Sequence, residues 1–225
     1  MNYEAKKLYP LYKRLHKQKP LPNGTKELRA AIVTFDMNKA TGVIEFNSRQ
    51  SNKKYLKQEL DWYISESLVP PEDIKVWQQI KSRKGLVNSN YGYLIFNKDN
   101  YYQFNNVLDT LLNDKHSRQA VMIYTRPSLH YDWCKDGMQD FICTYYQHFF
   151  IRDDTLYCIT NMRSNDCIFG TLNDIPWFEY VFNLLYNHLL YDYHSLKKGT
   201  LMFIANSFHC YERHYDVLKN IVIKK

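Results

Sequence analysis

The sequence predicts an α+β fold in which helices pack on one side of a mixed β-sheet. Predicted strands and helices are interleaved irregularly, and several strands are neighbours in sequence, which is typical of this class. Hydrophobic residues make up 45% of the chain and charged residues 24%, as in globular proteins. The 225 residues contain no internal repeat and no Ser/Gly-rich linker, so we expect a single domain spanning residues 1–225.

In the first half of the chain, apolar residues at helical spacing predict helices over Glu4–Lys17, Lys54–Ser65 and Tyr101–Leu112. β-branched and aromatic residues predict strands at Arg29–Phe35 and Gly42–Phe46. Because only a short polar segment separates these two strands, we expect them to pair as a hairpin.

The second half contains a second expected hairpin, formed by strands Phe141–Ile151 and Leu156–Met162 around a turn at residues 152–154. The remaining predicted elements are a strand at Gln119–Thr125, a helix at Pro176–His194 with proline in its first turn, a strand at Leu201–Ala205 and a helix at Tyr211–Asn220.

The chain is basic, with 30 Lys and Arg against 23 Asp and Glu and a net charge of +7. This charge is compatible with nucleic acid, an anionic membrane surface or small anions such as phosphate esters. No apolar run approaches the ~18 residues needed to cross a bilayer, and the N-terminus lacks the apolar core of a secretory signal. We therefore expect a soluble cytoplasmic protein without a membrane partner.

The five cysteines are odd in number, and none forms a CxxC pair with metal-site spacing. This pattern argues against a disulfide framework and a structural zinc, and we expect no metal. Five free thiols fit a reducing compartment.

Cys143 lies in an apolar and aromatic strand, where most cysteines are buried structural thiols. A reactive thiol instead needs a nearby cation that favours the thiolate. If the second hairpin forms as expected, Arg163 lies just beyond its last paired residue, near the level of Phe141–Cys143. Its guanidinium could favour a thiolate and hold a phosphate through two hydrogen bonds.

Other positions also allow two interpretations each. Glu59 lies at the margin of the apolar face of its helix, either as a solvated glutamate or as a partly desolvated general acid/base. Asp174 precedes the long helix, where an N-cap is the ordinary role of an aspartate. His209 and Tyr211 fall on the same side of an extended segment, as a core hydrogen-bonded pair or as ligand contacts.

Eight ordered blocks together match one known pattern. They are QELDWY around Glu59, VWQQI around Trp77, NSNYG around Tyr91, SRQAVMIYTRPS from Ser117, KDGMQDFICT around Cys143, NMRSND, FGTLND and SFHCYERH. From about Lys54 to His214 the chain resembles the thymidylate synthase superfamily, and within it the phage deoxycytidylate hydroxymethylases most closely. Before Lys54 the family's Gly/Thr-rich phosphate-binding signature is missing, and Lys26 and Arg29 are the candidates there.

The resemblance implies covalent catalysis by a homodimer that forms through the sheet. Cys143 would attack C6 of the pyrimidine, so that C5 takes the one-carbon unit of 5,10-methylenetetrahydrofolate. Glu59 would position water and move protons, with Tyr91 in the same network. Trp77 and Glu59 would also contact this folate co-substrate.

The resemblance also implies how the nucleotide is held. Arg163 and Ser164 would bind the phosphate from the same subunit, and Arg118 would reach it from the partner subunit, with Lys26 as a further candidate. His209 and Tyr211 would contact the sugar hydroxyls. The Asp166 region would lie against the pyrimidine edge.

The chain departs from thymidylate synthases at two positions. They carry Asn four residues after the glycine equivalent to Gly170, where its amide matches uracil, whereas this chain has Asp174, as cytidylate-acting members do. A carboxylate can accept from the cytosine amine and share a proton with N3. Gln119 replaces a second consecutive arginine, for which Arg126 or Lys26 would compensate.

The resemblance therefore implies a deoxycytidylate 5-hydroxymethyltransferase that makes 5-hydroxymethyl-dCMP from dCMP, methylenetetrahydrofolate and water, for modified phage DNA in the host cytoplasm. In the same class, dUMP hydroxymethylation or thymidylate synthesis is the alternative, against which Asp174 argues. A nucleic-acid-binding module is a distant alternative, because the aromatic residues fall mostly in apolar runs. We expect no direct contact with nucleic acid.

Overall fold

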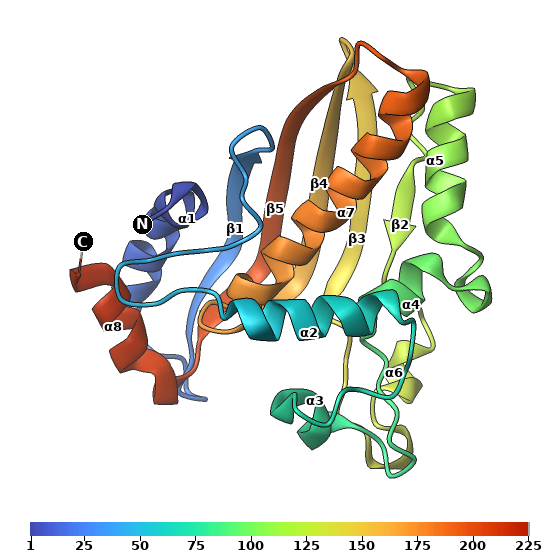
Figure 1. Cartoon of the computed structure of the whole chain (residues 1–225). Coiled ribbons are helices and arrows are strands. Elements are labelled where there is room, and N and C mark those ends of the chain that lie inside the picture. The colour runs from blue at the N-terminus through green and yellow to red at the C-terminus, as the bar shows by residue number, and fades with distance from the viewer. Residues whose placement is uncertain (225) are drawn as a thin grey trace.

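The computed structural model describes residues 1–224, which form one five-stranded mixed sheet with helices around it (Figure 1). The strands lie in the order β1-β5-β4-β3-β2. Their bounds are β1 Lys26–Asp36, β2 Val121–Ile123, β3 Thr144–Arg152, β4 Thr155–Asp166 and β5 Lys197–Cys210. The β4–β5 pair is parallel and the other three pairs are antiparallel, so the expected α+β class with a mixed sheet is confirmed.

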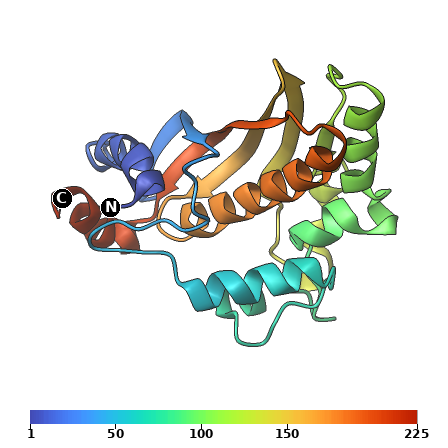
Figure 2. The same ribbon diagram turned by 45° about the horizontal axis from the view of Figure 1, so that its top comes forward.

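The long helix α7 lies across one face of the sheet, and α2 crosses near its first turns (Figures 1 and 2). Helices α1 and α8 lie together beyond β1, and α5 lies beside β2 at the other edge. The helix bounds are α1 Tyr3–His16, α2 Lys53–Ile64, α3 Lys75–Ile80, α4 Tyr91–Phe96, α5 Gln103–Asn113, α6 Leu129–Asp132, α7 Gly170–Asp192 and α8 Tyr215–Ile223. Among residues 1–224, no helix combines the length and apolar character that crossing a bilayer requires.

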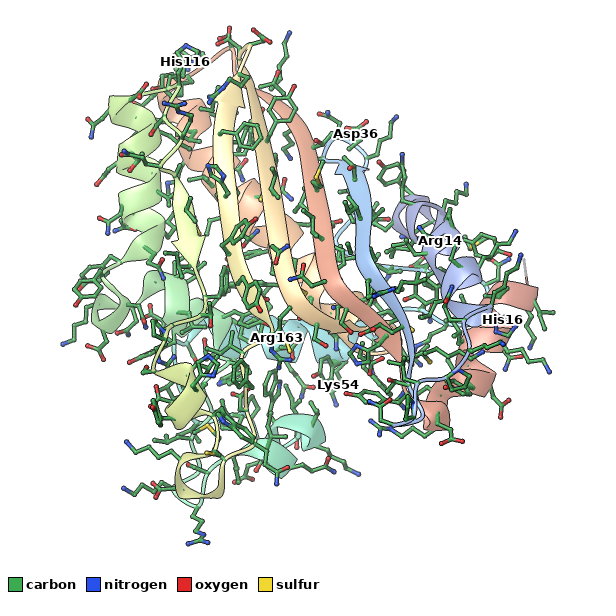
Figure 3. All side chains as sticks on the ribbon, turned by 180° about the vertical axis from the view of Figure 1, so that it is seen from behind. Arg14, His16, Asp36, Lys54, His116 and Arg163 are labelled. Atoms are coloured by element: carbon green, nitrogen blue, oxygen red, sulfur yellow. The ribbon has the colours of Figure 1, made fainter. Side chains whose placement is uncertain are left out.

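The core lies between α7 and the sheet. Phe178 and Phe182 of α7 and Phe149 and Phe203 of the strands are fully buried. Burial of such a side chain contributes roughly 1.5–3 kcal/mol, so this layer fixes α7 against the sheet. The opposite sheet face has no helix over it, as the view from behind shows (Figure 3), and Ile32 is 54% exposed there.

The expected hairpin between Arg29–Phe35 and Gly42–Phe46 is wrong. Strand β1 exists, but it pairs with β5 from the far end of the chain. Residues 42–46 form no strand, apart from one isolated bridge between Glu45 and Gln50. Ile44 and Phe46 of this segment are buried in the core, so their apolar side chains serve packing and not strand pairing.

The long helix begins at Gly170, six residues before the expected start at Pro176. A proline inside a helix has no N–H for the carbonyl four residues earlier, here that of Leu172. The Ser51 hydroxyl donates to this carbonyl at 3.1 Å. A side chain from another segment thus replaces the missing hydrogen bond, and the helix continues through the proline. Asp174 is the fifth residue of the helix, so the N-cap interpretation is wrong.

The other expected elements are confirmed with shifted ends. The helices expected at Glu4–Lys17, Lys54–Ser65 and Tyr101–Leu112 match α1, α2 and α5 within about two residues, and the second hairpin forms as β3–β4. Strand β2 is shorter and β5 longer than expected, and the C-terminal helix α8 begins at Tyr215 after a single 3₁₀ turn. Three short helices, α3, α4 and α6, were not expected.

Gly92 explains how α4 approaches α2. A Cβ atom at this position would lie 1.8 Å from the carbonyl oxygen of Tyr63, so only glycine permits the contact. The close approach lets the ring of Tyr91 stack on that of Tyr63, with centroids 5.3 Å apart. The two helices therefore bring Tyr91 and Glu59 to the same end of the sheet.

Candidate active site

Cys143 and Arg163 lie together where β3 begins, at the lower end of the sheet in Figure 3. The Arg163 backbone N–H donates to the carbonyl of Cys143, which extends the β3–β4 pairing by one bond. The guanidinium donates to the carbonyls of Phe141 and Ile142 at 2.7 and 3.1 Å and lies 3.5 Å from the Cys143 sulfur. The position expected for Arg163 from the strand pairing is thus confirmed.

Opposing influences act on the pKa of the Cys143 thiol. Burial raises its pKa to about 11, the positive charge of Arg163 lowers it, and the carboxyl groups of Asp174 and Asp140 raise it. Cys158, Cys167 and Cys210 are buried in the core, whereas Cys143 is half-exposed. Of the cysteines among residues 1–224, Cys143 combines partial exposure with a cation beside its sulfur, as a nucleophile requires.

Asp174 points from α7 toward the same end of the sheet. Its Oδ2 accepts a hydrogen bond from Asn165 Nδ2 at 2.8 Å, and the Thr171 hydroxyl donates to Asn165 Oδ1. Burial first, and the nearby charge of Glu59 second, raise the pKa of Asp174 well above its usual range. Both influences favour the neutral form of the carboxyl group, which can donate as well as accept a hydrogen bond.

Glu59 is buried, with 5% of its surface exposed, so the solvated interpretation is wrong. Its Oε1 accepts from the Tyr55 hydroxyl at 3.0 Å and from Trp77 Nε1 at 2.9 Å. Burial raises the pKa of Glu59 to about 7, and these two hydrogen bonds limit the increase. A carboxyl group that titrates near neutral pH suits general acid/base work.

Tyr91 joins the site from α4. The hydroxyl of Thr144, the residue after Cys143, donates to the Tyr91 oxygen at 2.9 Å. Burial raises the pKa of Tyr91, and the charges of Asp174 and Cys143 raise it further. The phenol is therefore neutral and keeps its own proton available for donation.

A second group of polar side chains lies where β4 and β5 end side by side. Asp166 pairs with His209 in the parallel register, and Ser164 Oγ lies 3.3 Å from His209 Nδ1. The rings of His209 and Tyr211 meet edge to face at 4.9 Å, as their shared side of the strand predicted. Arg163 precedes Ser164 on β4, and its charge acts on Tyr211, so these polar groups lie at the same end of the sheet as Arg163.

Two predicted phosphate ligands have other surroundings in this chain. Lys26 donates to the carbonyl of His16 at 2.7 Å and covers the Tyr215 ring. Arg118 precedes Ala120, whose carbonyl accepts from the N–H of Phe149, six residues along β3 from Cys143. Six residues of strand span about 20 Å, so Arg118 does not reach Cys143 of its own chain.

The sequence analysis missed an aromatic surface next to Asp166. Phe169 is 52% exposed, Arg49 lies 4.8 Å above its ring, and the His214 ring meets it at 5.1 Å. The available signal was a bulky aromatic residue directly before Gly170, at the start of the long helix. It also missed Asn165, although that residue stands inside the NMRSND block. Within residues 1–224, no three His, Cys, Asp or Glu side chains group as metal ligands would.

The same pattern occurs in known proteins. The family model for thymidylate synthase matches residues 15–225. The deoxycytidylate 5-hydroxymethyltransferases of Enterobacteria phages T4 and T2 are each 43% identical over 170 residues, which cover 73% of this chain and 69% of theirs. The thymidylate synthase of Clostridium beijerinckii is 24% identical over 155 residues, or 68% of this chain and 54% of its own. The resemblance seen in the motifs is confirmed: the chain belongs to the thymidylate synthase family.

Proposed function

We propose that the chain makes 5-hydroxymethyl-dCMP from dCMP, taking the one-carbon unit from 5,10-methylenetetrahydrofolate and the hydroxyl group from water. The product would supply modified phage DNA. Similarity to the phage deoxycytidylate enzymes supports the proposal, and one structural observation carries it: the buried carboxyl group of Asp174, held by Asn165, lies within electrostatic reach of the Cys143 thiol.

Cys143 would form the covalent bond to C6 of the pyrimidine. The pKa of about 11 keeps its thiol protonated at neutral pH, so the proton would pass through water to the ionised form of Glu59 as the sulfur–carbon bond forms. Attack at C6 makes C5 nucleophilic, which splits a difficult substitution into easier steps. Arg163 lies close enough to favour the developing thiolate.

Asp174 would select the base. A neutral carboxyl group can give its proton to N3 of cytosine while it accepts from the exocyclic amine. Sharing a proton with N3 withdraws electrons from the ring and helps attack at C6. Uracil N3 already carries a proton and cannot take one from Asp174, so this activation of the ring is lost with uracil. An ionised Asp174 would also face uracil O4 with a second acceptor, a mismatch that costs about 1–3 kcal/mol when it is buried. This argument favours dCMP over the alternatives of dUMP hydroxymethylation and thymidylate synthesis.

Glu59 would act on the water that completes the reaction. Its pKa of about 7 lets it accept a proton from water and release it within one cycle. Oε1 is occupied by Tyr55 and Trp77, so the other oxygen would face the water. Tyr91 would extend this network through its own hydroxyl proton.

Nucleotide binding would use the groups at the ends of β4 and β5. Arg163 and Ser164 would hold the phosphate, while His209 and Tyr211 would bind the sugar hydroxyls. The folate would lie against Trp77, near Asp166, with Phe169 and Arg49 at its outer side. An aromatic ring beside a guanidinium fits an aromatic ligand with a carboxylate tail.

The decisive experiment offers dCMP and dUMP separately with methylenetetrahydrofolate and identifies the product by mass spectrometry. We expect hydroxymethylated dCMP with no rise in dihydrofolate absorbance. Dihydrofolate formed together with a methylated nucleotide would show reductive methylation instead. Turnover of dUMP in preference to dCMP would overturn the assigned role of Asp174.

We also propose that the active unit is a homodimer that forms through the open face of the sheet. On this face, Ile32 pairs with Ile204, and Ile123 is 54% exposed. His148 Nε2 has no hydrogen-bond partner among residues 1–224. Burying this apolar surface in a two-fold contact would stabilise the dimer, and would let the exposed Arg118 serve the partner's phosphate site.

Mixed dimers test this arrangement. Inactive Cys143→Ser and Arg118→Ala chains, unfolded together and refolded in equal amounts, should give about half mixed dimers by random pairing. One site of each mixed dimer has neither lesion, so about a quarter of wild-type activity should return. Cys143→Ser mixed with Glu59→Ala is the control and should restore nothing. No recovery after proven exchange would show that Arg118 does not act across the interface.

A further inference from the structure

Tyr55 is a residue of α2 to which the sequence motifs assign no role. It lies in the first turn of the helix, where its N–H donates at 3.1 Å to the side chain of Asn52, the N-cap residue. Glu59 follows four residues later, so the two side chains share one face of α2. The Tyr55 hydroxyl donates to Glu59 Oε1 at 3.0 Å. The capped first turn therefore fixes a phenol beside a buried carboxyl group.

The phenol of Tyr55 faces two carboxyl groups. Burial raises the pKa of Tyr55, the charge of Glu59 raises it further, and the charge of Asp174 adds to this effect. The phenol is therefore neutral and has a proton to donate. Figure 1 shows why both carboxyl groups are near it, because α2 crosses the first turns of α7, to which Asp174 belongs.

The two carboxyl groups receive unequal hydrogen bonding. Glu59 Oε1 accepts from two donors, the Tyr55 hydroxyl and Trp77 Nε1 of α3. Asp174 accepts from one side chain, that of Asn165. Donors stabilise the ionised form of a carboxyl group, so two of them favour ionisation more than one does. The charge of Glu59 in turn raises the pKa of Asp174. The arrangement favours a negative charge on Glu59 and a proton on Asp174.

The other groups around the pair supply no positive charge to either carboxyl group. Within residues 1–224, neither Glu59 nor Asp174 forms an ion pair. The titratable groups that act on them or respond to them come from α2, α4, β4 and the segment before β3, and they are Tyr63, Tyr91, Asp166 and Cys143. Since none of these four is a cation, hydrogen-bond donors decide which carboxyl group ionises first.

We propose that Tyr55 is a positioning residue for Glu59, whose hydroxyl holds the negative charge on Glu59 and leaves the proton on Asp174. The inference rests on the proposed function, in which Glu59 accepts a proton from water and Asp174 donates one to cytosine N3. Acid groups with different surroundings divide acid and base roles in this way. Trp77 donates to the same oxygen but is also expected to contact the folate. Tyr55 is therefore the donor that can be removed without changing a folate contact.

Tyr55→Phe tests the proposal, because it removes only the hydroxyl group. The ionisation of Glu59 is measured by NMR of ¹³C-labelled glutamate carboxyl groups in the whole chain. Glu179 also titrates near neutral pH, so the signal that Glu59→Gln lacks identifies Glu59. We expect the pKa of Glu59 to rise by about one pH unit in Tyr55→Phe, since one hydrogen bond to an ionised group changes its ionisation constant about tenfold.

The kinetics should show the same shift. With the ascending limb of kcat displaced by about one pH unit, turnover of dCMP should fall about fivefold at pH 7 and return to within about twofold of wild type at pH 9. KM for dCMP should stay constant, because Tyr55 is not a nucleotide ligand. A residue with a purely structural role would lower kcat equally at every pH.

Tyr9→Phe is the matched control. The Tyr9 hydroxyl donates to the carbonyl of Val222 at 2.8 Å, between α1 and α8, so this variant loses a hydroxyl group and a hydrogen bond away from Glu59. It should change neither the titration of Glu59 nor the pH profile of kcat. 3-Fluorotyrosine at position 55 is a second probe that keeps the test valid if Tyr55→Phe folds poorly. Its hydroxyl is a stronger donor, so the pKa of Glu59 should fall.

The NMR titration does not depend on turnover, which separates the two possible failures. A wild-type chain that does not hydroxymethylate dCMP, while Tyr55→Phe still raises the pKa of Glu59, would refute the proposed function and not the effect of Tyr55 on Glu59. An unchanged pKa of Glu59 with both phenylalanine and 3-fluorotyrosine at position 55 would overturn the inference, whatever happens to kcat.

Discussion

Two pairs of buried carboxyl groups include a residue of α7. The two pairs differ in their position on the helix and in their surroundings. Asp174 faces Glu59 of α2, and Glu179, five residues later, faces Glu4 of α1. Five residues turn a helix by about 140° from the starting direction, so the pairs lie on different sides of α7. Burial raises the pKa of Glu59 to about 7 and that of Glu179 to about 8, with repulsion from Glu4 adding to the latter.

The two carboxyl pairs differ in the groups that surround them. Asp174 acts electrostatically on the Cys143 thiol and the Tyr91 phenol, and the Arg163 guanidinium lies beside that thiol. Glu4 and Glu179 instead accept the backbone N–H groups of Thr41 and Gly42 and hold the segment after β1 onto α7. A raised pKa therefore marks burial in both places, and only the neighbouring reactive groups identify a catalytic site.

Removal of the nucleophile beside Asp174 should have the largest effect on turnover. We expect Cys143→Ser to reduce turnover by about a thousandfold or more, because the serine hydroxyl forms the C6 bond far less readily. Nucleotide binding should persist, since Arg163, Ser164 and His209 make the ground-state contacts. Steady-state kinetics and dCMP titration measure both properties. Turnover within tenfold of wild type would contradict the assignment of Cys143.

The next largest effect is expected at Glu59. Its glutamine variant should lose about 10²–10⁴-fold in kcat. In the wild type, the ionised form that accepts a proton from water grows as pH rises through about 7, so kcat should rise from pH 6 and level off above pH 8. The variant should lack this ascending limb. An unchanged pH profile in Glu59→Gln would assign the limb to another group.

Asp174→Asn should change which base is preferred. The amide reverses one pairing at the base edge, and a mismatch worth about 1–3 kcal/mol moves the ratio of kcat/KM for dCMP over dUMP by roughly tenfold or more. Separate kinetics with the two nucleotides measure the ratio. A constant ratio accompanied by a lower Tm would mean that Asp174 supports the helix and does not select the base.

The last change, Glu179→Gln, should alter how the free energy of unfolding depends on pH. The folded-state pKa of about 8 exceeds the usual 4.5, so this group stabilises the fold below pH 4.5, and that contribution is lost as pH rises toward 8. The loss approaches about 1.4 kcal/mol per pH unit, and the amide removes it. Urea unfolding at pH 5, 6.5 and 8 should show that the free energy of unfolding of the variant increases relative to that of wild type as pH rises. Glu66→Gln is the control, and a parallel shift at every pH would contradict the assignment.

Strong local patterns predicted much of the fold. Helices α1, α2 and α5 have clear apolar stripes, and the β3–β4 hairpin has a short polar turn. Pairing of β1 with β5 joins residues far apart in sequence, and local alternation gives no information about such a partner. The early start of α7 was hidden for a similar reason, because the hydroxyl that supports Pro176 comes from Ser51.

The candidate site, like the fold, could be predicted from the sequence only in part. The contact between Arg163 and Cys143 followed from strand register, which the sequence supplies once the hairpin is recognised. The motifs identified Glu59 and Asp174, but their burial depends on how α2 packs on α7. Arg49 and Phe169 meet only in the folded chain, so no spacing rule connects them.

Pro176 divides α7 into two parts, and the hydrogen bond from the Ser51 hydroxyl to the Leu172 carbonyl keeps the helix continuous between them. Before Pro176 lie Gly170, Thr171 and Asp174, which shape the site, and after it lie the aromatic residues that fill the core. A proline interrupts the hydrogen-bond ladder between the parts, so substitutions in the first part disturb the second less than they would in an unbroken helix. Substrate choice can therefore change in evolution at Asp174 while the interior of the protein stays constant.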